Sequence, residues 1–436
     1  MPQMHSSWLT VLPSGRWYLQ ISRQTTGKRR RKPLTARVGP FSSKKKLYIG
    51  LPSQQPGRIR TRVNWKFVND TLRLGPLIGI LTVGEGAAFT GNRENFRDIF
   101  LSGKKLGALV YVFTPQGINW EKKKIRGYVY NERENHWQEL ILPFPHVIYN
   151  RIPTRKAEQR PEVKRTLRRI HELPNVTFFN RCFFDKQELF AMLGEHTEVR
   201  PYLPDTKKLD TLARFRSFCS EHSYVYLKPV RGKAGEGIMR IDFTNNRWRL
   251  QRLKEQKAIT NRFTSLEEMW KHVHRLTRKQ RYIMQQGIRR ARYQGKPFDV
   301  RVLVQKNGVG EWGVTGIGIR RAGRQSITTH VPRGGSIHSA TSVFSVLFPN
   351  NPAQVEAQIR QTALTIARAL QENIEDLAEM SMDLGLTATG EIWFFEANAK
   401  PEKFDEPGIR SRSLSNLIHY AQYVSHLQKE RETAVG

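Results

Sequence analysis

The 436-residue sequence predicts a mixed α+β fold that is divided into several units along the chain. Three observations support this prediction. Short alternating segments fill a basic N-terminal stretch, a strand–helix–strand pattern follows from about residue 75, and a strand-rich region with a long helix occupies residues 223–420. Because single domains usually span about 100–200 residues, the chain can build two or three cores. A hydrophobic content of 38% agrees with a folded protein.

The formal net charge of +35 is the most unusual property of the composition. Such an excess implies an anionic partner, which can be nucleic acid, an acidic polymer, an anionic surface or nucleotide phosphates. Charge alone does not distinguish between these partners.

Other features of the composition predict a cytoplasmic protein. None of the apolar runs approaches the roughly 20 residues that a membrane-spanning helix needs. The N-terminus lacks the basic start and apolar core of a secretory signal. Cys182 and Cys219 are too few for a disulfide framework or a zinc cluster, so we expect two inert thiols in a reducing compartment.

Residues 1–72 form the first predicted unit, a basic β-rich module. Residues 1–75 contain sixteen Lys and Arg but a single acid, Asp70, which gives this segment a net charge of +15. Polar and apolar residues alternate in "RWYLQI" and "KLYIGL", and Pro and Gly separate such pieces. We therefore expect short antiparallel strands on a small, separate module.

Residues 73–155 form a predicted α/β unit. "GPLIGILT" is a continuous apolar run of the kind found in buried strands, and "ALVYVFTP" is a second one. Between them, "NRENFRDIFLSGKKLG" has apolar residues at helical spacing and a Gly at its end. "HVIYNRIPTR" closes the unit with a strand and a proline turn, so the pattern predicts a βαβ arrangement.

The remaining boundaries rest on similar patterns. We expect residues 156–222 to be mostly helical, with "FDKQELFAML" as an amphipathic piece. Residues 223–420 contain strands and the helix "QVEAQIRQTALTIARALQENI", and we divide them into subdomains of about 223–284 and 285–420. A last helix leads into a polar end at residues 421–436.

A strand bearing Lys228 runs into a loop with Gly232, Gly235 and Gly237, and a second strand, "IMRI", follows. Glycines allow backbone N–H groups to approach a phosphate, and the lysine adds a positive charge. The loop matches neither a Walker loop nor a dinucleotide fingerprint. Taken alone, the segment is equally consistent with a flexible hairpin and an exposed lysine.

Two further strands carry polar residues of interest. "YIMQQGI" turns abruptly polar at its end, where backbone groups could meet an adenine edge, although an ordinary strand end would look the same. In "PFDVRVLVQK", Asp299 and Arg301 share one face of the strand while valines fill the other. Their side chains can form a local salt bridge, or Arg301 can be oriented toward a phosphate.

The hairpin "SMDLGLTATGEIWFFEANAKP" gathers three oxygen-bearing side chains. Asp383 lies on its first strand, and Glu396 and Asn398 lie on its second, after the turn "TATG". Period-two alternation places Glu396 and Asn398 on one face, with Trp393 and Phe395 packed behind them. A solvated face explains this pattern too, but two carboxylates and an amide suit Mg²⁺. Two residues beyond Asn398, "FEANAKP" places Lys400 on the same face, where we expect a basic rim.

The order of these elements resembles the ATP-grasp superfamily, in which two α+β subdomains clamp ATP between antiparallel sheets. "NRCFFDKQELF", "YLPDT" and "VPRGGSIH" are similar to further segments of that superfamily. More narrowly, "GPLIGILT", "YNRIPTR", "FDVRVLVQK" followed by "EWGVTGIGIR", and "FEANAKP" resemble the YheC/YheD family of endospore coat-associated proteins. The resemblance covers roughly residues 75–415 and implies an ATP-grasp core at 223–420, preceded by a pre-ATP-grasp domain at 73–155.

The resemblance also implies a role for each matching residue. ATP phosphates would be bound by Lys228 and Lys186, with Gly235 and Gly237 in the loop that covers them. Arg301 would face the transferred phosphate. The sets implied for the adenine side and for Mg²⁺ are Gln285, Gln286, Gly287 and Ile288, and Asp383, Glu396 and Asn398, respectively.

One position departs from the family pattern. Family members usually have an Asn a few residues before the Gly-Gly pair, and the matching position here is His330. An imidazole can also hydrogen-bond a phosphate, so His330 is included among the nucleotide-binding residues. The alternative is a surface residue without a catalytic role, which would put catalytic competence in doubt.

Three functions from different classes follow. The resemblance implies an ATP- and Mg²⁺-dependent ligase that joins an unknown carboxylate to an unknown amine through an acylphosphate. The alternative is a catalytically weak scaffold of the spore coat, attached through its basic N-terminal module to an anionic polymer or to coat components. Nucleic-acid binding is the least favoured, because Trp8, Trp17, Tyr18, Tyr48 and Trp65 fit the core of a small β-module as well as a binding surface.

Overall fold

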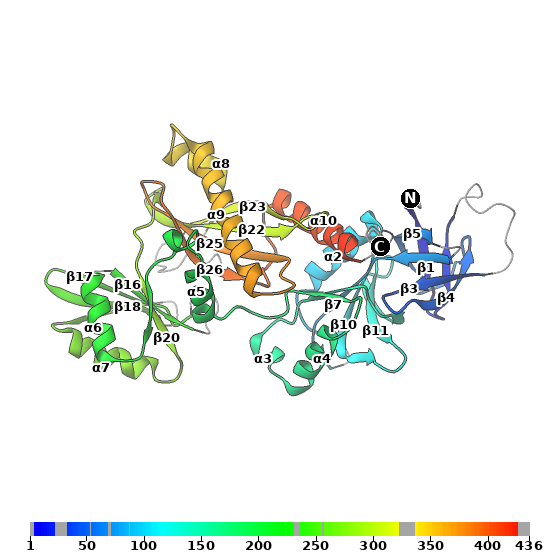
Figure 1. The fold of residues 1–436 in the computed structure, drawn as a ribbon, viewed down its shortest axis with the longest axis horizontal. Helices are drawn as coiled ribbons and strands as arrows, with labels where there is room; N and C mark the ends of the chain where they lie inside the picture. The colour runs from blue at the N-terminus through cyan, green and yellow to red at the C-terminus, as the bar shows by residue number, and fades with distance from the viewer. Residues whose placement is uncertain are drawn as a thin grey trace, which may run out of the picture.

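Four sheets follow one another along the molecule (Figure 1). The computed structural model describes residues 4–21, 33–52, 54–68, 71–86, 88–222, 224–230, 236–254, 257–321 and 336–425. A barrel lies at one end, an α/β unit follows, and the chain then runs to a small sheet at the far end. It returns to build the fourth sheet between the small sheet and the α/β unit.

The N-terminal unit is a closed six-stranded barrel in the order β1-β2-β4-β3-β6-β5. Its strands are β1 (His5–Val11), β2 (Trp17–Leu19), β3 (Leu34–Val38), β4 (Ser43–Ile49), β5 (Ile59–Val68) and β6 (Thr71–Gly75). The β-rich prediction is confirmed, but two pairs, β2–β4 and β3–β6, are parallel, contrary to the antiparallel expectation. Alternation predicts strands but not their partners, because pairing depends on contacts distant in sequence.

The sequence led us to expect that residues 1–72 form a separate module. In the structure, the barrel is instead packed into one core with the α/β unit. Its buried side chains belong to the same hydrophobic cluster as those of the α/β unit. Asn64 on β5 donates its N–H to Gly107 O at 2.8 Å, and a Cβ on Gly107 would lie 2.0 Å from Asn64 Oδ1. The two units therefore share a core, and removing the barrel would expose it.

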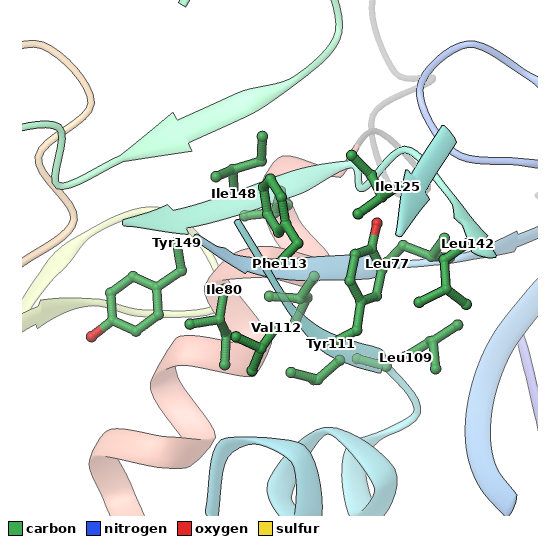
Figure 2. Close-up of a cluster of buried hydrophobic side chains, with 14 of the residues drawn as sticks. Leu77, Ile80, Leu109, Tyr111, Val112, Phe113, Ile125, Leu142, Ile148 and Tyr149 are labelled. Carbon is green, nitrogen blue, oxygen red and sulfur yellow. The ribbon is translucent and has the colours of Figure 1, made fainter. Parts of the chain in front are cut away.

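The α/β unit is a six-stranded sheet in the order β12-β11-β10-β7-β13-β14. Figure 2 shows the side chains at its centre, including Leu77, Tyr111 and Ile148, which are fully buried. The strands are β7 (Leu77–Leu81), β10 (Leu109–Asn119), β11 (Lys124–Asn131), β12 (His136–Pro143), β13 (Val147–Asn150) and β14 (Thr177–Phe179). Beside it, β8 (Gly84–Glu85) and β9 (Ala88–Phe89) form a short ribbon.

The predicted βαβ arrangement is confirmed. Strand β7 pairs in parallel with both β10 and β13. Helix α2 (Arg93–Leu106) connects β7 to β10, beginning at Asn92, whose side chain accepts from Asn95 N at 3.0 Å. It ends at Gly107, which has a φ of 84°. A glycine suits this left-handed C-cap because other residues are strained there.

The next segment is mostly helical and also supplies one strand to each neighbouring sheet. Its elements are α3 (Arg155–Glu158), α4 (Pro161–His171), β14, α5 (Lys186–Gly194), the 3₁₀-helix η1 (Arg200–Tyr202), β15 (Thr206–Leu209) and α6 (Leu212–Glu221). Strand β15 is the edge of the small sheet, whose order is β15-β20-β16-β17-β18-β19. The other members are β16 (Tyr224–Pro229), β17 (Met239–Thr244), β18 (Arg247–Lys254), β19 (Lys257–Phe263) and β20 (Tyr282–Gln286), with α7 (Leu266–Thr277) packed beside α6.

The fourth sheet has the order β24-β23-β22-β25-β26. Its strands are β22 (Lys296–Lys306), β23 (Trp312–Arg321), β24 (Ser336–Ser339), β25 (Glu379–Leu386) and β26 (Ile392–Asn398), and β21 (Arg292–Tyr293) pairs with β22. The helices are α8 (Ala340–Leu347), α9 (Pro352–Asn373) and α10 (Pro407–Val424). Helix α10 places Leu417, Ile418 and Ala421 in the cluster shared by the barrel and the α/β unit. Among the helices described, none is both long enough and apolar enough to cross a bilayer.

Candidate functional site

Three neighbouring strands of the fourth sheet bring the predicted metal ligands and Arg301 together. Asp383 on β25 lies directly opposite Glu396 on β26, and Ser381 lies opposite Asn398. On its other side, Asp383 lies opposite Arg301 of β22. Asn398 Nδ2 is 3.5 Å from Glu396 Oε1, and Arg301 Nε is 4.0 Å from Asp383 Oδ1. The alignment follows from the hairpin that the sequence predicts.

The prediction that Trp393 and Phe395 pack together behind the ligands is wrong. The register of β25 and β26 shifts between Asp383 and Leu384, and Phe395 is the additional residue on β26. The bulge turns Phe394 and Ala397 into the core and leaves Phe395 half-buried. The Phe395 ring instead lies 5.5 Å from Lys228 Nζ, so an aromatic face forms part of the site.

Lys186 connects helix α5 to strand β26, which carries Glu396 and Asn398. The side chain of Asp185 caps the helix by accepting from Gln187 N at 3.0 Å, which fixes Lys186 in the first turn. Lys186 Nζ then reaches Glu396 Oε2 at 2.8 Å. The lysine predicted to face the nucleotide thus lies against a predicted metal ligand.

The two facing carboxylates differ in their protonation equilibria. Burial, together with the neighbouring Glu396, raises the pKa of Asp383 although Arg301 opposes the change. Burial also acts to raise the pKa of Glu396, but the Lys186 and Lys228 ammonium groups outweigh it and lower that pKa. Asp383 is therefore the carboxyl of the pair for which burial outweighs the nearby positive charge.

Lys228 lies on β16 beside the same carboxylate. Burial and the Lys186 charge lower the pKa of Lys228 to about 7, although Glu396 and Asp299 oppose the change. Lys228 Nζ donates to Gln285 Oε1, and Gln285 in turn donates to Thr206 Oγ1 at 3.1 Å. These bonds hold the lysine at the side of the small sheet that faces the ligand strands.

Arg290 and Asp299 were not predicted as a pair. They form an ion pair in which both side chains are largely buried. Arg290 also lies 6.0 Å from the Phe395 ring. The sequence carries no sign of this pairing, because Arg290 lies in a connection outside the alternating strand.

The predicted adenine hinge lies where β20 ends. Gln285 is buried, and the N–H groups of Gln286 and Gly287 donate to Asp205 O and Tyr224 O at 2.8 and 2.7 Å. A Cβ on Gly287 would lie 2.2 Å from the Tyr224 ring, which explains the glycine. These two N–H groups are therefore engaged within the protein, and Ile288 follows them as a buried residue.

A cavity of about 380 Å³ lies between helix α5 and strands β15 and β20. Its lining includes Phe190, Thr206, Lys208 and Ile283. Ile283 lies opposite both Lys208 and Lys228 in the sheet register. The cavity thus opens on the same face of the small sheet as Lys228.

Of the predicted phosphate loop, residues 236 and 237 lie in the part of the chain that the structure describes. Gly237 has a φ of 72°, and Tyr282 donates its hydroxyl to Gly237 O at 3.2 Å. Gly232, Gly235, His330 and most of "VPRGGSIH" lie outside the described residues. The residues Ser336–Ser339 that follow form strand β24, which pairs with β23.

The predicted basic rim at Lys400 is wrong. Its side chain is only 3% exposed and forms an ion pair with Glu158 of α3. Lys400 also donates to Ile152 O at 3.4 Å, and burial lowers its pKa to about 8. Strand β26 has ended at Asn398, so alternation no longer places the side chain, and Lys400 joins the sheet to the α/β unit instead.

Asn180 is a positioning residue that the sequence does not identify on its own. Its Nδ2 donates to Ala399 O at 2.6 Å and to Glu379 O at 3.1 Å. Its Oδ1 accepts from Ala378 N at 3.1 Å and Glu379 N at 3.3 Å. One buried amide therefore ties the start of β25 to the end of β26, next to the predicted ligands. Its φ of 57° is one that Asn tolerates better than most residues.

The donor set fits a hard divalent cation. Like charges directly opposite each other on a sheet are destabilising, and Asp383 faces Glu396 in this way. Two carboxylates and one amide are ligands that Mg²⁺ accepts, with water and phosphate completing the shell. Lys186 and Lys228 stand on the opposite wall, where phosphate oxygens would neutralise them.

Comparison with known proteins identifies the family. A family model described as YheC/D-like ATP-grasp matches residues 175–424, which is more than half of the chain. The chain belongs to this family. The YheC/D-like match also establishes the ATP-grasp fold. In the structure, the small sheet and the fourth sheet are the two sheets of this fold.

Two relatives of the YheC/D-like chain come from Bacillus subtilis (strain 168). Endospore coat-associated protein YheD is 31% identical over 385 residues, which cover 84% of this chain and 82% of YheD. Endospore coat-associated protein YheC is 25% identical over 297 residues, which cover 66% of this chain and 79% of YheC.

Solved structures are more distant. D-cycloserine synthetase DcsG is 14% identical with a TM-score of 0.47, covering 80% of this chain and 99% of DcsG. D-alanyl-alanine synthetase A from Vibrio cholerae is 10% identical with a TM-score of 0.47, covering 81% of this chain and 97% of that one. At these values neither structure carries an argument about the function of the YheC/D-like chain.

Proposed function

We propose that the protein is an ATP- and Mg²⁺-dependent ligase that joins a carboxylate to an amine. One observation carries this proposal: two lysines lie close to a pair of carboxylates, between the small sheet and the fourth sheet. Lys186 pairs with Glu396, Lys228 lies within electrostatic reach of both, and Asp383 lies opposite Glu396. The family match supports ATP as the nucleotide.

The residues divide into three tasks. Lys228 and Lys186 would hold the phosphates, with Gly237 and Gly235 in the loop beside them. The end of β20, from Gln285 to Ile288, would border the adenine. Asp383, Glu396 and Asn398 would hold Mg²⁺, which supplies positive charge to the phosphate oxygens when it is bound.

The chemistry needs no nucleophile from the protein. A carboxylate oxygen of the substrate attacks the γ-phosphorus of ATP, and the bond to the bridging oxygen breaks to release ADP. The amine nitrogen then attacks the carbonyl carbon of the acylphosphate, loses a proton and expels phosphate, leaving an amide. Arg301, with its planar donors beside Asp383, would stabilise negative charge on the transferring phosphoryl group.

The proposal is tested by an ADP-release screen with amino acids, short peptides and anionic polymers as candidate substrates. Wild type and Glu396→Ala are compared in parallel, with circular dichroism to confirm that both are folded. We expect Mg²⁺-dependent turnover with at least one substrate class and its loss in the variant. Equal turnover in the two proteins would refute the metal assignment.

A spore-coat scaffold with weak catalysis is the second candidate. The basic barrel supports it, because a ligase for small molecules has no evident need for such a charged unit. The coat-associated names of the two relatives support a role in the coat or envelope, with an anionic polymer or coat components as partners. In this case, nucleotide binding would be absent or would not be accompanied by turnover with any substrate.

Deletion of residues 1–72 is the simplest test of the scaffold function, but it would disturb the fold of the protein that remains. The barrel shares its core with the α/β unit, so deletion would expose the apolar side chains of the part that remains. Substitution of exposed lysines on the full-length chain keeps that core intact. If such variants lose localisation while retaining ATP turnover, the barrel is an anchor on an active enzyme.

A further inference from the structure

The barrel separates its aromatic residues into an inner and an outer set. Trp17 and Trp65 are buried in the interior. Trp8, Tyr18 and Tyr48 lie on the outer side of β1, β2 and β4 and are half-buried. The sequence left open whether these five residues form a core or a surface, and the structure assigns three of them to the surface.

Two of the outer aromatic residues, Tyr18 and Tyr48, lie in one row with Arg60 across neighbouring strands. Arg60 on β5 lies opposite Thr10 on β1, Thr10 lies opposite Tyr18 on β2, and Tyr18 lies beside Tyr48 on β4. The two tyrosine rings stack with centroids 5.1 Å apart and an angle of 27° between their planes. With strands spaced about 4.8 Å apart, the row spans about 14 Å, although the Thr10 side chain within it is buried.

A second group of cations continues this surface. On the hairpin β3–β4, Lys44 lies opposite Arg37, and Lys46 lies opposite Thr35. All four of these side chains are exposed. Like charges directly opposite each other destabilise a sheet unless a counterion neutralises them. Residues 1–75 offer one acid, Asp70, which lies outside the described residues.

Solubility alone does not require this composition. A solvated surface is typically built from charges of both signs, with few exposed aromatic rings. The outer positions of β1 to β5 described above combine cations, aromatic rings and hydroxyls, and none of them is acidic. This is the composition of surfaces that bind single strands, where cations track the backbone and rings stack on bases.

We propose that this outer face of the barrel binds single-stranded nucleic acid. Arg37, Lys44, Lys46 and Arg60 contact phosphates, and the stacked pair Tyr18 and Tyr48 contacts a base. An acidic polypeptide would use the same cations but would leave the half-buried tyrosine pair on this face without a function. The proposal is independent of the ligase site, which lies on the opposite side of the α/β unit (Figure 1).

Fluorescence anisotropy of the full-length protein with a labelled oligothymidylate of about 16 nucleotides tests the proposal. We expect Lys44→Gln/Lys46→Gln to weaken binding and to reduce the salt-dependence slope by about 1.4. The control, Lys105→Gln/Lys122→Gln, removes two exposed lysines from the α/β unit and should change the slope less. ATP turnover should be unaffected in both variants.

A second variant separates base recognition from charge attraction. Tyr18→Ala/Tyr48→Ala should lose at least about tenfold in affinity for the oligothymidylate, with no change in affinity for polyglutamate. A melting temperature near that of wild type verifies that the barrel remains folded. Equal competition by polyglutamate, equal affinity for a duplex, or unchanged binding by the tyrosine variant would each overturn the proposal.

Discussion

Lys186 Nζ lies 2.8 Å from Glu396 Oε2, so the first turn of helix α5 is joined to the strand that carries the predicted metal ligands. Without a nucleotide, the lysine supplies the positive charge that this carboxylate needs. Under the proposed function, Lys186 would hold a phosphate oxygen and Glu396 would hold Mg²⁺, which would supply positive charge there. The ion pair thus holds both partners close to the positions that the proposed function assigns to them.

The pKa of Lys228 leads to a prediction on proton uptake. Burial and Lys186 lower this pKa to about 7, so the side chain is mostly neutral in the free protein at about pH 8. Bound phosphates raise the pKa again, so ATP binding should take up a proton at about pH 8 and less below pH 7. By linkage, affinity should fall as pH rises above about 7.

Titration calorimetry in two buffers of different ionisation enthalpy measures this uptake. The buffer dependence should be largely lost in Lys228→Met. An identical uptake in the variant and wild type would show that another group takes up the proton.

Removing the Asn180 amide should weaken the hairpin that carries the ligands. Asn180→Ala leaves two buried carbonyl oxygens and two N–H groups without this partner. We expect a loss of about 2–4 kcal/mol in the free energy of unfolding. Urea denaturation measures it, and Mn²⁺ affinity should fall as well, because β25 and β26 would no longer be tied together.

Asn351→Ala is a matched control, since Asn351 makes no side-chain cap bond to helix α9. Its cost should stay within about 0.5 kcal/mol. A similarly small cost at Asn180 would contradict the role described for its amide.

Gly385 and Phe395 should be energetically coupled. A Cβ on Gly385 would lie 2.2 Å from Cζ of the Phe395 ring, so Gly385→Ala must displace that ring. We expect a cost of about 1–3 kcal/mol in wild type and little further cost in a Phe395→Ala background. A double-mutant cycle by chemical denaturation measures the coupling.

Gly194→Ala at the end of α5 is the control, because no atom lies within 4 Å of the added Cβ. Additive effects of the two substitutions at Gly385 and Phe395 would argue against the ring position that the β-bulge produces.

Two ion pairs of similar composition should differ in their contribution to stability. Lys400 and Glu158 are both buried, so Lys400→Met leaves an unpaired buried carboxylate, and we expect a loss of about 3–5 kcal/mol. Adding Glu158→Gln should recover part of that loss. Glu94 is exposed and Lys403 is only half-buried, so Lys403→Met should cost much less. Equal costs in guanidinium denaturation would contradict the structural role of Lys400.

The sequence predicted the local elements of the site well, because each depends on short-range patterns. Alternation and the turn "TATG" placed Asp383 and Glu396 on paired strands, which the register confirms. The apolar spacing of "FDKQELFAML" likewise predicted a helix, which in the structure begins at Lys186. Their assignment to Mg²⁺ and ATP remains a prediction.

The features that the sequence did not predict depend on contacts between segments that are distant along the chain. The bulge at Phe395 breaks the alternation of β26 without a marker such as Gly or Pro. Lys400 pairs with Glu158, which lies more than 200 residues earlier in the chain, so no local pattern indicates its burial. The closure of the barrel by parallel pairs has the same origin.

The proposed function requires that Asp383, Glu396 and Asn398 hold Mg²⁺ for ATP bound by Lys186 and Lys228. Calorimetric titration of ATP into wild type and Glu396→Gln, each with and without Mg²⁺, tests it most directly. Wild type should bind ATP at least about tenfold more tightly when Mg²⁺ is present, and the variant should lose most of this difference while remaining folded. The same Mg²⁺ dependence in both proteins, or no ATP binding by wild type, would contradict the claim.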